Sequence, residues 1–225
     1  MTIDRKLCDL CGKCAGACPS GALVVVGKAV TPDEILREIE KDVAFYDESD
    51  GGVTFSGGEP MMQPDFLNEL LEECKKRNIR TALDTCGYAS WETVNRMKDK
   101  VDLFLYDVKV MDDRRHKKYT GVSNKLILRN FVRLADGGSS ISIRFPIVPS
   151  VNDDAESVAK MAEFGLSHGV KQMYLLPYHR AGIEKYRSLD RPYKLDNLES
   201  PSEKKMQQIK EKLITRGLDV KIGGG

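Results

Sequence analysis

The chain has 225 residues, of which 41% are hydrophobic and 31% charged, as in a globular protein with one substantial domain and a small appendage. Its 35 Lys and Arg residues balance 34 Asp and Glu, so bulk charge gives no reason to expect a nucleic acid or a membrane surface as partner. No segment approaches the roughly 18 apolar residues that span a bilayer, and the N-terminus lacks the apolar stretch of a secretory signal. We therefore expect a cytoplasmic protein that keeps its six cysteines as thiols.

Residues 1–30 are rich in glycine and cysteine and have too few apolar residues to form a core alone. Four cysteines in this segment follow the spacing Cys-x2-Cys-x2-Cys-x3-Cys-Pro, which is the spacing of bacterial ferredoxins. Zinc sites typically use two separated pairs of ligands, so zinc is the weaker interpretation, beside a cysteine-rich loop without metal. We predict a ferredoxin-like segment over residues 1–30 that binds a 4Fe–4S cluster through Cys8, Cys11, Cys14 and Cys18.

From about residue 31 the chain alternates between helices and strands. Thr31 and Pro32, followed by two acidic residues, predict a helix that runs to about residue 41. Cys74 falls on the apolar face of a later helix, which indicates a packing role. Repeated βα units form either an open doubly wound sheet or a barrel, complete or partial. The predicted strands are 53–56, 81–84, 103–108, 140–147, 173–177 and 218–222; the further helices are 64–77, 90–98, 123–135, 153–168 and 202–216.

Charged and polar residues follow five consecutive predicted strands. A lone residue of this kind is most often a helix cap, a turn or a buried ion-pair partner. In βα-repeat folds, however, the active site lies at the carboxyl ends of the strands, so the shared placement favours a site. Acids and bases together suit a zwitterionic ligand such as an amino acid group. The residues concerned are Glu59, Asp84, Asp107, Lys109, Arg144 and His179.

Five motifs occur in order along the chain: TFSGGEP (54–60), LDTCGY (83–88), YDVK (106–109), GVSN (121–124) and LLPYH (175–179). Together with the cysteine spacing they resemble the glycyl-radical-enzyme activating proteins, the pyruvate formate-lyase activating enzyme group of the radical SAM superfamily. The resemblance covers nearly the whole chain. It implies an α/β fold, a partial (β/α) barrel of the radical SAM type over residues 31–225 that lacks its first strand, with the ferredoxin-like segment at the N-terminus.

The resemblance also implies cofactors, partners and site residues. In such enzymes a reduced 4Fe–4S cluster passes an electron to S-adenosylmethionine, and the resulting 5′-deoxyadenosyl radical removes a hydrogen atom from a glycine of a glycyl radical enzyme. Flavodoxin or ferredoxin would be the electron donor. By this resemblance the methionine amino group would be contacted by Gly57, Gly58 and Glu59. A monovalent cation site beside the methionine carboxylate would be formed by Asp84, Thr85, Asp107 and Val108. Further contacts with the cofactor would come from Lys109, Arg144 and His179.

The sequence departs from the family in one respect. The family's radical-generating cluster is held by a Cys-x3-Cys-x2-Cys loop after the first barrel strand, and these 225 residues contain no such spacing. We therefore expect an N-terminally truncated chain whose strand at 53–56 is an unprotected edge. The expected function is that of a radical SAM oxidoreductase that activates a glycyl radical enzyme, inactive in this chain alone. The alternative is a non-catalytic iron–sulfur protein that transfers electrons or binds such an enzyme.

Overall fold

Parallel strands form the centre of the molecule. The computed structural model describes residues 3–4, 6–180, 182–189, 191–193, 195 and 197–224, and within them six strands form one sheet in the order β1-β2-β3-β4-β5-β6. Every neighbouring pair is parallel. The six predicted strands are thereby confirmed. They are β1 (Val53–Phe55), β2 (Thr81–Thr85), β3 (Leu103–Asp107), β4 (Ile141–Ile147), β5 (Gln172–Pro177) and β6 (Asp219–Ile222).

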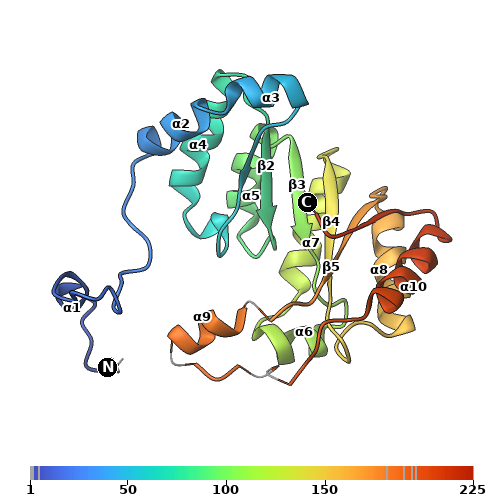
Figure 1. Ribbon diagram of the computed structural model, residues 1–225. Helices are drawn as coiled ribbons and strands as arrows, with labels where there is room; N and C mark the ends of the chain where they lie inside the picture. The colour runs from blue at the N-terminus through green and yellow to red at the C-terminus, as the bar shows by residue number, and fades with distance from the viewer. Residues whose placement is uncertain are drawn as a thin grey trace.

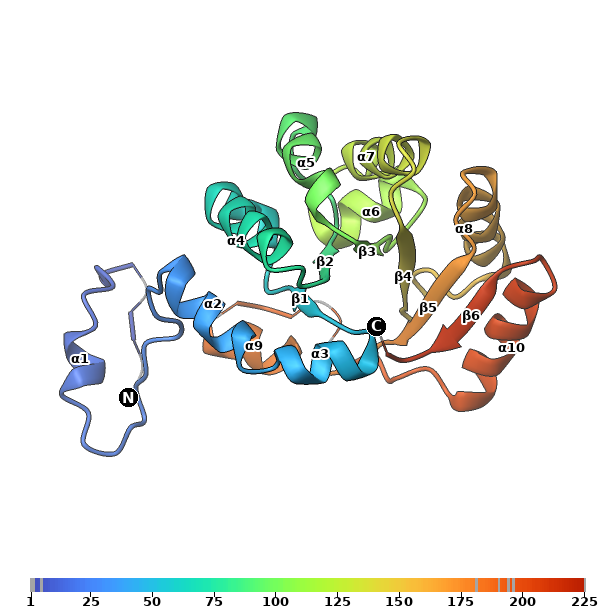
Figure 2. The same cartoon turned by 90° about the horizontal axis from the view of Figure 1, so that it is seen from above.

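Helices cover the convex side of this curved sheet, as Figure 2 shows in the view from above. The strand order never reverses, whereas a doubly wound sheet has a switch point from which strands are added in both directions. The structure therefore decides for the barrel type, with β1 and β6 as the two edges of the sheet. The helices that cover the sheet are α4 (Pro64–Lys76), α5 (Trp91–Met97), α7 (Lys125–Asp136), α8 (Ala155–Ser167) and α10 (Glu203–Ile214).

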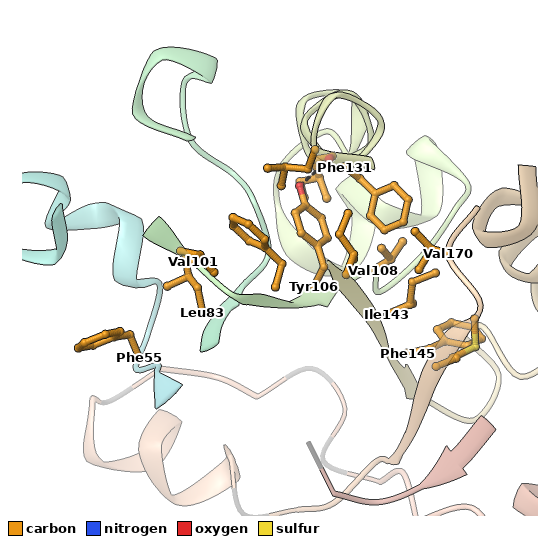
Figure 3. Packing of buried hydrophobic residues seen from close by; sticks show 14 of the residues in the cluster. Phe55, Leu83, Val101, Tyr106, Val108, Phe131, Ile143, Phe145 and Val170 are labelled. Carbon is orange, nitrogen blue, oxygen red and sulfur yellow. Dashed lines mark hydrogen bonds between the residues drawn. The ribbon is translucent and has the colours of Figure 1, made fainter. Parts of the chain in front are cut away.

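The hydrophobic core lies between the sheet and these helices. Tyr106 of β3 packs edge-on against Phe131 of α7, with ring centroids 5.3 Å apart and both side chains fully buried (Figure 3). In β4, Ile143 and Phe145 are fully buried, whereas Arg144 between them is not. Because side chains along a strand alternate between faces, this pattern leaves Arg144 on the concave face, away from the covering helices.

Shorter elements precede the sheet or lie in its loops. Helix α2 (Pro32–Glu40) begins where the sequence predicts, because the Thr31 hydroxyl accepts from the Glu34 N–H and the Glu34 carboxylate accepts from the Thr31 N–H at 2.7 Å. None of the described helices is long and apolar enough to cross a membrane. The remaining elements are α1 (Lys13–Gly16), α3 (Val43–Ser49), α6 (Asp113–Thr120), α9 (Gly182–Ser188) and two 3-10 turns, η1 (Pro60–Met62) and η2 (Lys98–Lys100).

The N-terminal segment stays outside the core. Figure 1 shows the chain before α2 extending away from the sheet as a separate piece. None of the described residues in positions 3–30 is buried, and apolar side chains such as Leu10 and Val26 are 80% and 93% exposed. This agrees with a segment that lacks a core of its own. The division into a cluster-binding segment over 1–30 and a barrel over 31–225 stays a prediction.

Candidate functional site

The carboxyl ends of β2, β3 and β4 carry a cluster of opposite charges. The register of the sheet places Asp107 opposite Arg144. The Arg144 guanidinium forms an ion pair with Asp84, and its Nε lies 3.6 Å from Oδ1 of Asp107. Lys109 Nζ lies 3.3 Å from the other oxygen of Asp107. The structure thus brings together four of the residues that the sequence places at strand ends.

These charges are only partly in contact with water. The side chains of Arg144, Asp84 and Asp107 are 21%, 24% and 22% exposed. Burial raises the pKa of Asp107, while the charges of Lys109 and Arg144 act in the opposite direction. The two cations, Arg144 and Lys109, balance the two carboxylates, Asp84 and Asp107, so a ligand that carries both charges would keep the cluster balanced.

Two atoms of the cluster are buried without a hydrogen-bond partner among the described residues. They are Oδ1 of Asp107, an acceptor, and Nε of Arg144, a donor. Their separation of 3.6 Å is too long for a hydrogen bond between them. Since buried polar atoms are almost always paired, these two fit a ligand that supplies both a donor and an acceptor. The methionine end of S-adenosylmethionine has this chemistry, with an ammonium and a carboxylate on one carbon.

Glu59 connects the loops that follow β1 and β2. Its carboxylate accepts from the Thr85 hydroxyl at 2.6 Å, from the Cys86 N–H at 2.9 Å and from the Met61 N–H at 3.2 Å. A carboxylate offers about four acceptor positions, so one remains for a ligand. Glu59 therefore fixes the loop after β2 and has one acceptor position that these three bonds do not use.

Three glycines lie in the loops that Glu59 connects: Gly57 and Gly58 after β1, and Gly87 after β2. Gly57 and Gly58 are exposed with open space beside them, and Gly57 has a φ of +143°, a conformation that favours glycine. Gly87 is packed against Tyr106, whose hydroxyl oxygen would lie 1.7 Å from a β carbon at this position. The backbone at residues 57–58 is thus free for a close approach, and the loop after β2 is tightly held.

Thr85, Cys86 and Val108 have structural partners of their own. The Thr85 hydroxyl, besides donating to Glu59, accepts from the Gly87 N–H at 2.9 Å. Burial and the nearby Glu59 raise the pKa of the Cys86 thiol to about 11, which indicates a small, unreactive side chain rather than a nucleophile. Val108 is buried, and its N–H donates to the Arg144 carbonyl at 3.0 Å.

His179 lies just past the end of β5, at the same edge of the sheet. The residue is exposed, and no hydrogen bond or ion pair joins it to another described residue. The sequence therefore places His179 correctly by element, whereas its contact with a cofactor stays a prediction. Its neighbour Tyr178 is buried and shares a hydrogen bond of 2.9 Å with Tyr193.

The four N-terminal cysteines are free thiols outside the barrel. Among the described residues no three His, Cys, Asp or Glu side chains stand close enough to hold a metal ion. The donor set fits a 4Fe–4S cluster in kind and spacing, but the thiols would have to be drawn together around it. Hydrogen bonds from the Ser20 side chain and the Leu23 backbone lower the pKa of Cys18 to about 7, which favours the thiolate that binds iron.

Sequence reasoning missed a set of buried asparagines that support the loops of this edge. Asn124, Asn130 and Asn152 are all at most 2% exposed. Asn130 carried a usable signal, because it is a polar residue between Ile127 and Phe131 on the buried face of α7. A polar residue on an apolar helix face requires a hydrogen-bond partner, and here the partners are loop carbonyls.

Comparisons with known proteins show which family the chain belongs to. Residues 15–162 match the family described as the radical SAM superfamily, and residues 1–24 match the 4Fe-4S binding domain. The chain is 45% identical over 194 residues to the isethionate sulfite-lyase activating enzyme of Nitratidesulfovibrio vulgaris, covering 85% of this chain and 63% of that protein. It is 43% identical over 208 residues to the trans-4-hydroxy-L-proline dehydratase activating enzyme of Clostridioides difficile, covering 91% and 69%.

A solved structure gives the same result. The fold resembles a domain of pyruvate-formate lyase-activating enzyme from Bacteroides vulgatus with a TM-score of 0.65 and 36% identity, over 77% of this chain and 99% of that one. The chain spans 63% of the length of the isethionate relative, so it corresponds to part of that protein. The two family descriptions imply a 4Fe–4S cluster and S-adenosylmethionine as cofactors. The chain belongs to the radical SAM superfamily and, within it, to the glycyl-radical-enzyme activating enzymes.

Proposed function

We propose that this chain binds S-adenosylmethionine at the carboxyl ends of β1 to β4 and serves the activation of a glycyl radical enzyme. The observation that carries the proposal is the pair of buried, unpartnered atoms on Asp107 and Arg144 within a balanced charge cluster. Relatives named as activating enzymes for a sulfite-lyase and a dehydratase support the same class of partner. Which glycyl radical enzyme is activated here is set by residues that contact the partner.

Different residues at the carboxyl edge of the sheet bind different groups of the ligand. Arg144 and Lys109 offer positive charge to the methionine carboxylate, and the free oxygen of Asp107 accepts from the ammonium. Glu59 has one acceptor position left for the same ammonium. The open backbone at residues 57–58 permits close approach, and His179 lies exposed at the same edge. A monovalent cation held by Asp84, Thr85, Asp107 and Val108, as the family resemblance implies, would lie beside the methionine carboxylate.

When bound beside a reduced cluster, S-adenosylmethionine would supply the radical chemistry that takes a hydrogen atom from the partner's glycine. These 225 residues contain no Cys-x3-Cys-x2-Cys spacing, and the four clustered cysteines lie in the exposed N-terminal segment (Figure 1). We therefore expect the segment to relay electrons from a flavodoxin or ferredoxin, and the chain alone to leave the cofactor intact.

Anaerobic reconstitution with iron and sulfide tests the proposal. After reduction with dithionite and addition of S-adenosylmethionine, we expect no 5′-deoxyadenosine and about four irons per chain, the content of one cubane. Product in proportion to protein, or about eight irons per chain, would contradict this account. A cluster that forms on a chain unable to bind S-adenosylmethionine would instead support a non-catalytic iron–sulfur protein that transfers electrons or binds a partner.

A further inference from the structure

Three buried asparagines each join two backbone carbonyls at the carboxyl edge of the sheet, in the loops that follow β2 and β3 or near the end of β4. Asn130 of α7 donates through Nδ2 to the carbonyls of Gly87 and Ala89, at 2.9 and 2.8 Å. Asn124, just before α7, donates to those of Val110 and Met111, at 3.0 and 2.8 Å. The first pair of carbonyls belongs to the loop after β2 and the second to the loop after β3.

Asn152 joins two loops rather than one. Its Nδ2 donates to the Lys109 carbonyl at 2.7 Å, after β3, and to the Pro146 carbonyl at 2.6 Å, near the end of β4. Its Oδ1 accepts from the Val148 N–H at 2.8 Å. The backbone of Lys109 is thereby tied to the end of the strand that carries Arg144. We call Asn124, Asn130 and Asn152 the bridging asparagines.

The location of these residues separates them from ordinary core polar groups. Among the described residues the buried asparagines are these three, and each bonds at the carboxyl edge of the sheet. At the amino edge the Thr81 hydroxyl donates to one carbonyl, that of Lys100. In βα-repeat folds the carboxyl edge carries the chemistry and the amino edge serves stability. A neutral amide with two donors is suited to hold two carbonyls without adding charge beside the cluster.

We propose that the bridging asparagines are positioning residues of the S-adenosylmethionine site. The inference rests on the proposed function. Asn152 sets the distance between Lys109 and Arg144, and Asn130 holds the loop whose Cys86 N–H meets Glu59. Removal of an asparagine leaves two loop carbonyls without a donor, so the loop opens more readily. A site whose ligand groups come from several loops loses affinity when those loops shift.

The experiment compares Asn152→Ala with Thr81→Val as a control, since both remove a buried side-chain group that donates to a backbone carbonyl. S-adenosylmethionine affinity is measured by ligand-observed NMR, and amide hydrogen exchange follows residues 109–111, 147 and 148 without ligand. For Asn152→Ala we expect a loss of affinity of about tenfold and faster exchange in both loops. For Thr81→Val we expect an affinity within about twofold of wild type.

Asn152→Asp adds a readout that a purely structural role would not give. The carboxylate keeps the acceptor for the Val148 N–H but faces two carbonyls that need donors. When protonated it can donate to one of them. The affinity of Asn152→Asp for S-adenosylmethionine, relative to wild type, should therefore rise as the pH falls. The relative affinity of Asn152→Ala should not change with pH. The charged groups around Asn152 belong to the adjoining site and to its own loop, and the comparison with wild type removes every contribution that the substitution leaves unchanged. They are Asp84, Asp107, Lys109 and Arg144 in the site, and Arg115, Asp153 and Asp154 at the loop.

The outcomes are distinct. A wild-type chain that does not bind S-adenosylmethionine overturns the proposed function, while hydrogen exchange still tests whether Asn152 holds its loops. The inference is overturned if the wild-type chain binds S-adenosylmethionine and Asn152→Ala binds it equally well. It is also overturned if Asn152→Ala loses no more affinity than Thr81→Val does. If Asn152→Ala does not fold, Asn130→Ala provides the same comparison at residues 87–89, with the same result expected.

Discussion

Replacement of Arg144 by Met tests the charge cluster, because the Arg144 guanidinium pairs with Asp84 and lies 3.6 Å from Asp107. Methionine has a similar shape but leaves two carboxylates with Lys109 as their nearby cation, 3.3 Å from Asp107. Removal of one partner of a buried ion pair costs about 3–5 kcal/mol. These side chains keep about a fifth of their surface exposed. We therefore expect Arg144→Met to lower the free energy of unfolding at neutral pH by about 3 kcal/mol, the lower end of this range.

The pH dependence of this loss has a definite sign. Burial raises the pKa of Asp107 even with Arg144 present, and Arg144 is one of the charges that oppose the rise. Without Arg144 the folded-state pKa of Asp107 rises further. A carboxyl group whose pKa is higher in the folded state contributes stability below its unfolded pKa and loses that contribution as the pH rises through the folded pKa. The stability difference between wild type and Arg144→Met should therefore narrow from neutral pH toward about pH 4.

Urea unfolding followed by circular dichroism, at both pH values, measures this difference. Arg115→Met is a matched control, because Arg115 pairs with Asp154 at 2.8 Å but both side chains are nearly half exposed. A surface pair of this kind contributes at most about 1 kcal/mol. A cost for Arg144→Met no larger than that of the control, or a difference that widens in acid, would refute the reasoning.

Three further predictions concern single residues. Gly87→Ala should lose more than about 2 kcal/mol of unfolding free energy, because its φ is +67° and its new β carbon would lie 1.7 Å from the Tyr106 hydroxyl oxygen. Gly169→Ala, with a φ of +73° and open space, should lose only about 1–2 kcal/mol, and equal losses would argue against the clash. In the metal-free chain near neutral pH, iodoacetamide should modify Cys18 faster than Cys86, because the pKa of Cys18 is about 7 and that of Cys86 about 11. Mass spectrometry follows both modifications, and equal rates would contradict this prediction. Thr31→Ala should cost about 1 kcal/mol in thermal or urea unfolding by removing the capping box of α2, and an unchanged stability would show that the cap is not needed.

The sheet could be predicted from the sequence because most strands are short apolar runs buried by covering helices, whereas β6 alternates charged and apolar residues. Helix α4 was equally clear, since Leu67, Leu71 and Cys74 recur at helical spacing and are buried. Helix α3 was not foreseen, because the seven residues Val43–Ser49 contain no fully buried residue and only Val43 and Tyr46 pack partly against the core. Helix α6 carries a run of basic residues, but His116 within it is buried and its ring bonds the Val122 carbonyl at 2.8 Å. Charge patterning alone could not separate that histidine from its exposed neighbours.

The site was predictable as far as strand ends are concerned. Parallel strands bring their carboxyl ends together, so the meeting of Asp84, Asp107 and Arg144 followed from their positions. The hydrogen bonds of Glu59 to the loop after β2 could not be predicted in this way. They join residues 26 and 27 positions apart and depend on side-chain rotamers. The same holds for Asn152 and the Lys109 carbonyl, 43 positions apart. Such contacts depend on loop geometry, which no local pattern encodes.

The affinity of the chain for S-adenosylmethionine tests the central claim most directly. It should be measured for wild type, for Lys109→Met at the carboxyl edge of the sheet and for Arg80→Met, which removes an exposed cation paired with Asp50 beside the amino end of β2. A charged hydrogen bond contributes about 1.5–3 kcal/mol, so Lys109→Met should bind about tenfold more weakly. Arg80→Met should bind as wild type does. A wild-type chain that does not bind, or a Lys109→Met variant that binds as tightly as wild type, would contradict the placement of the cofactor at this edge.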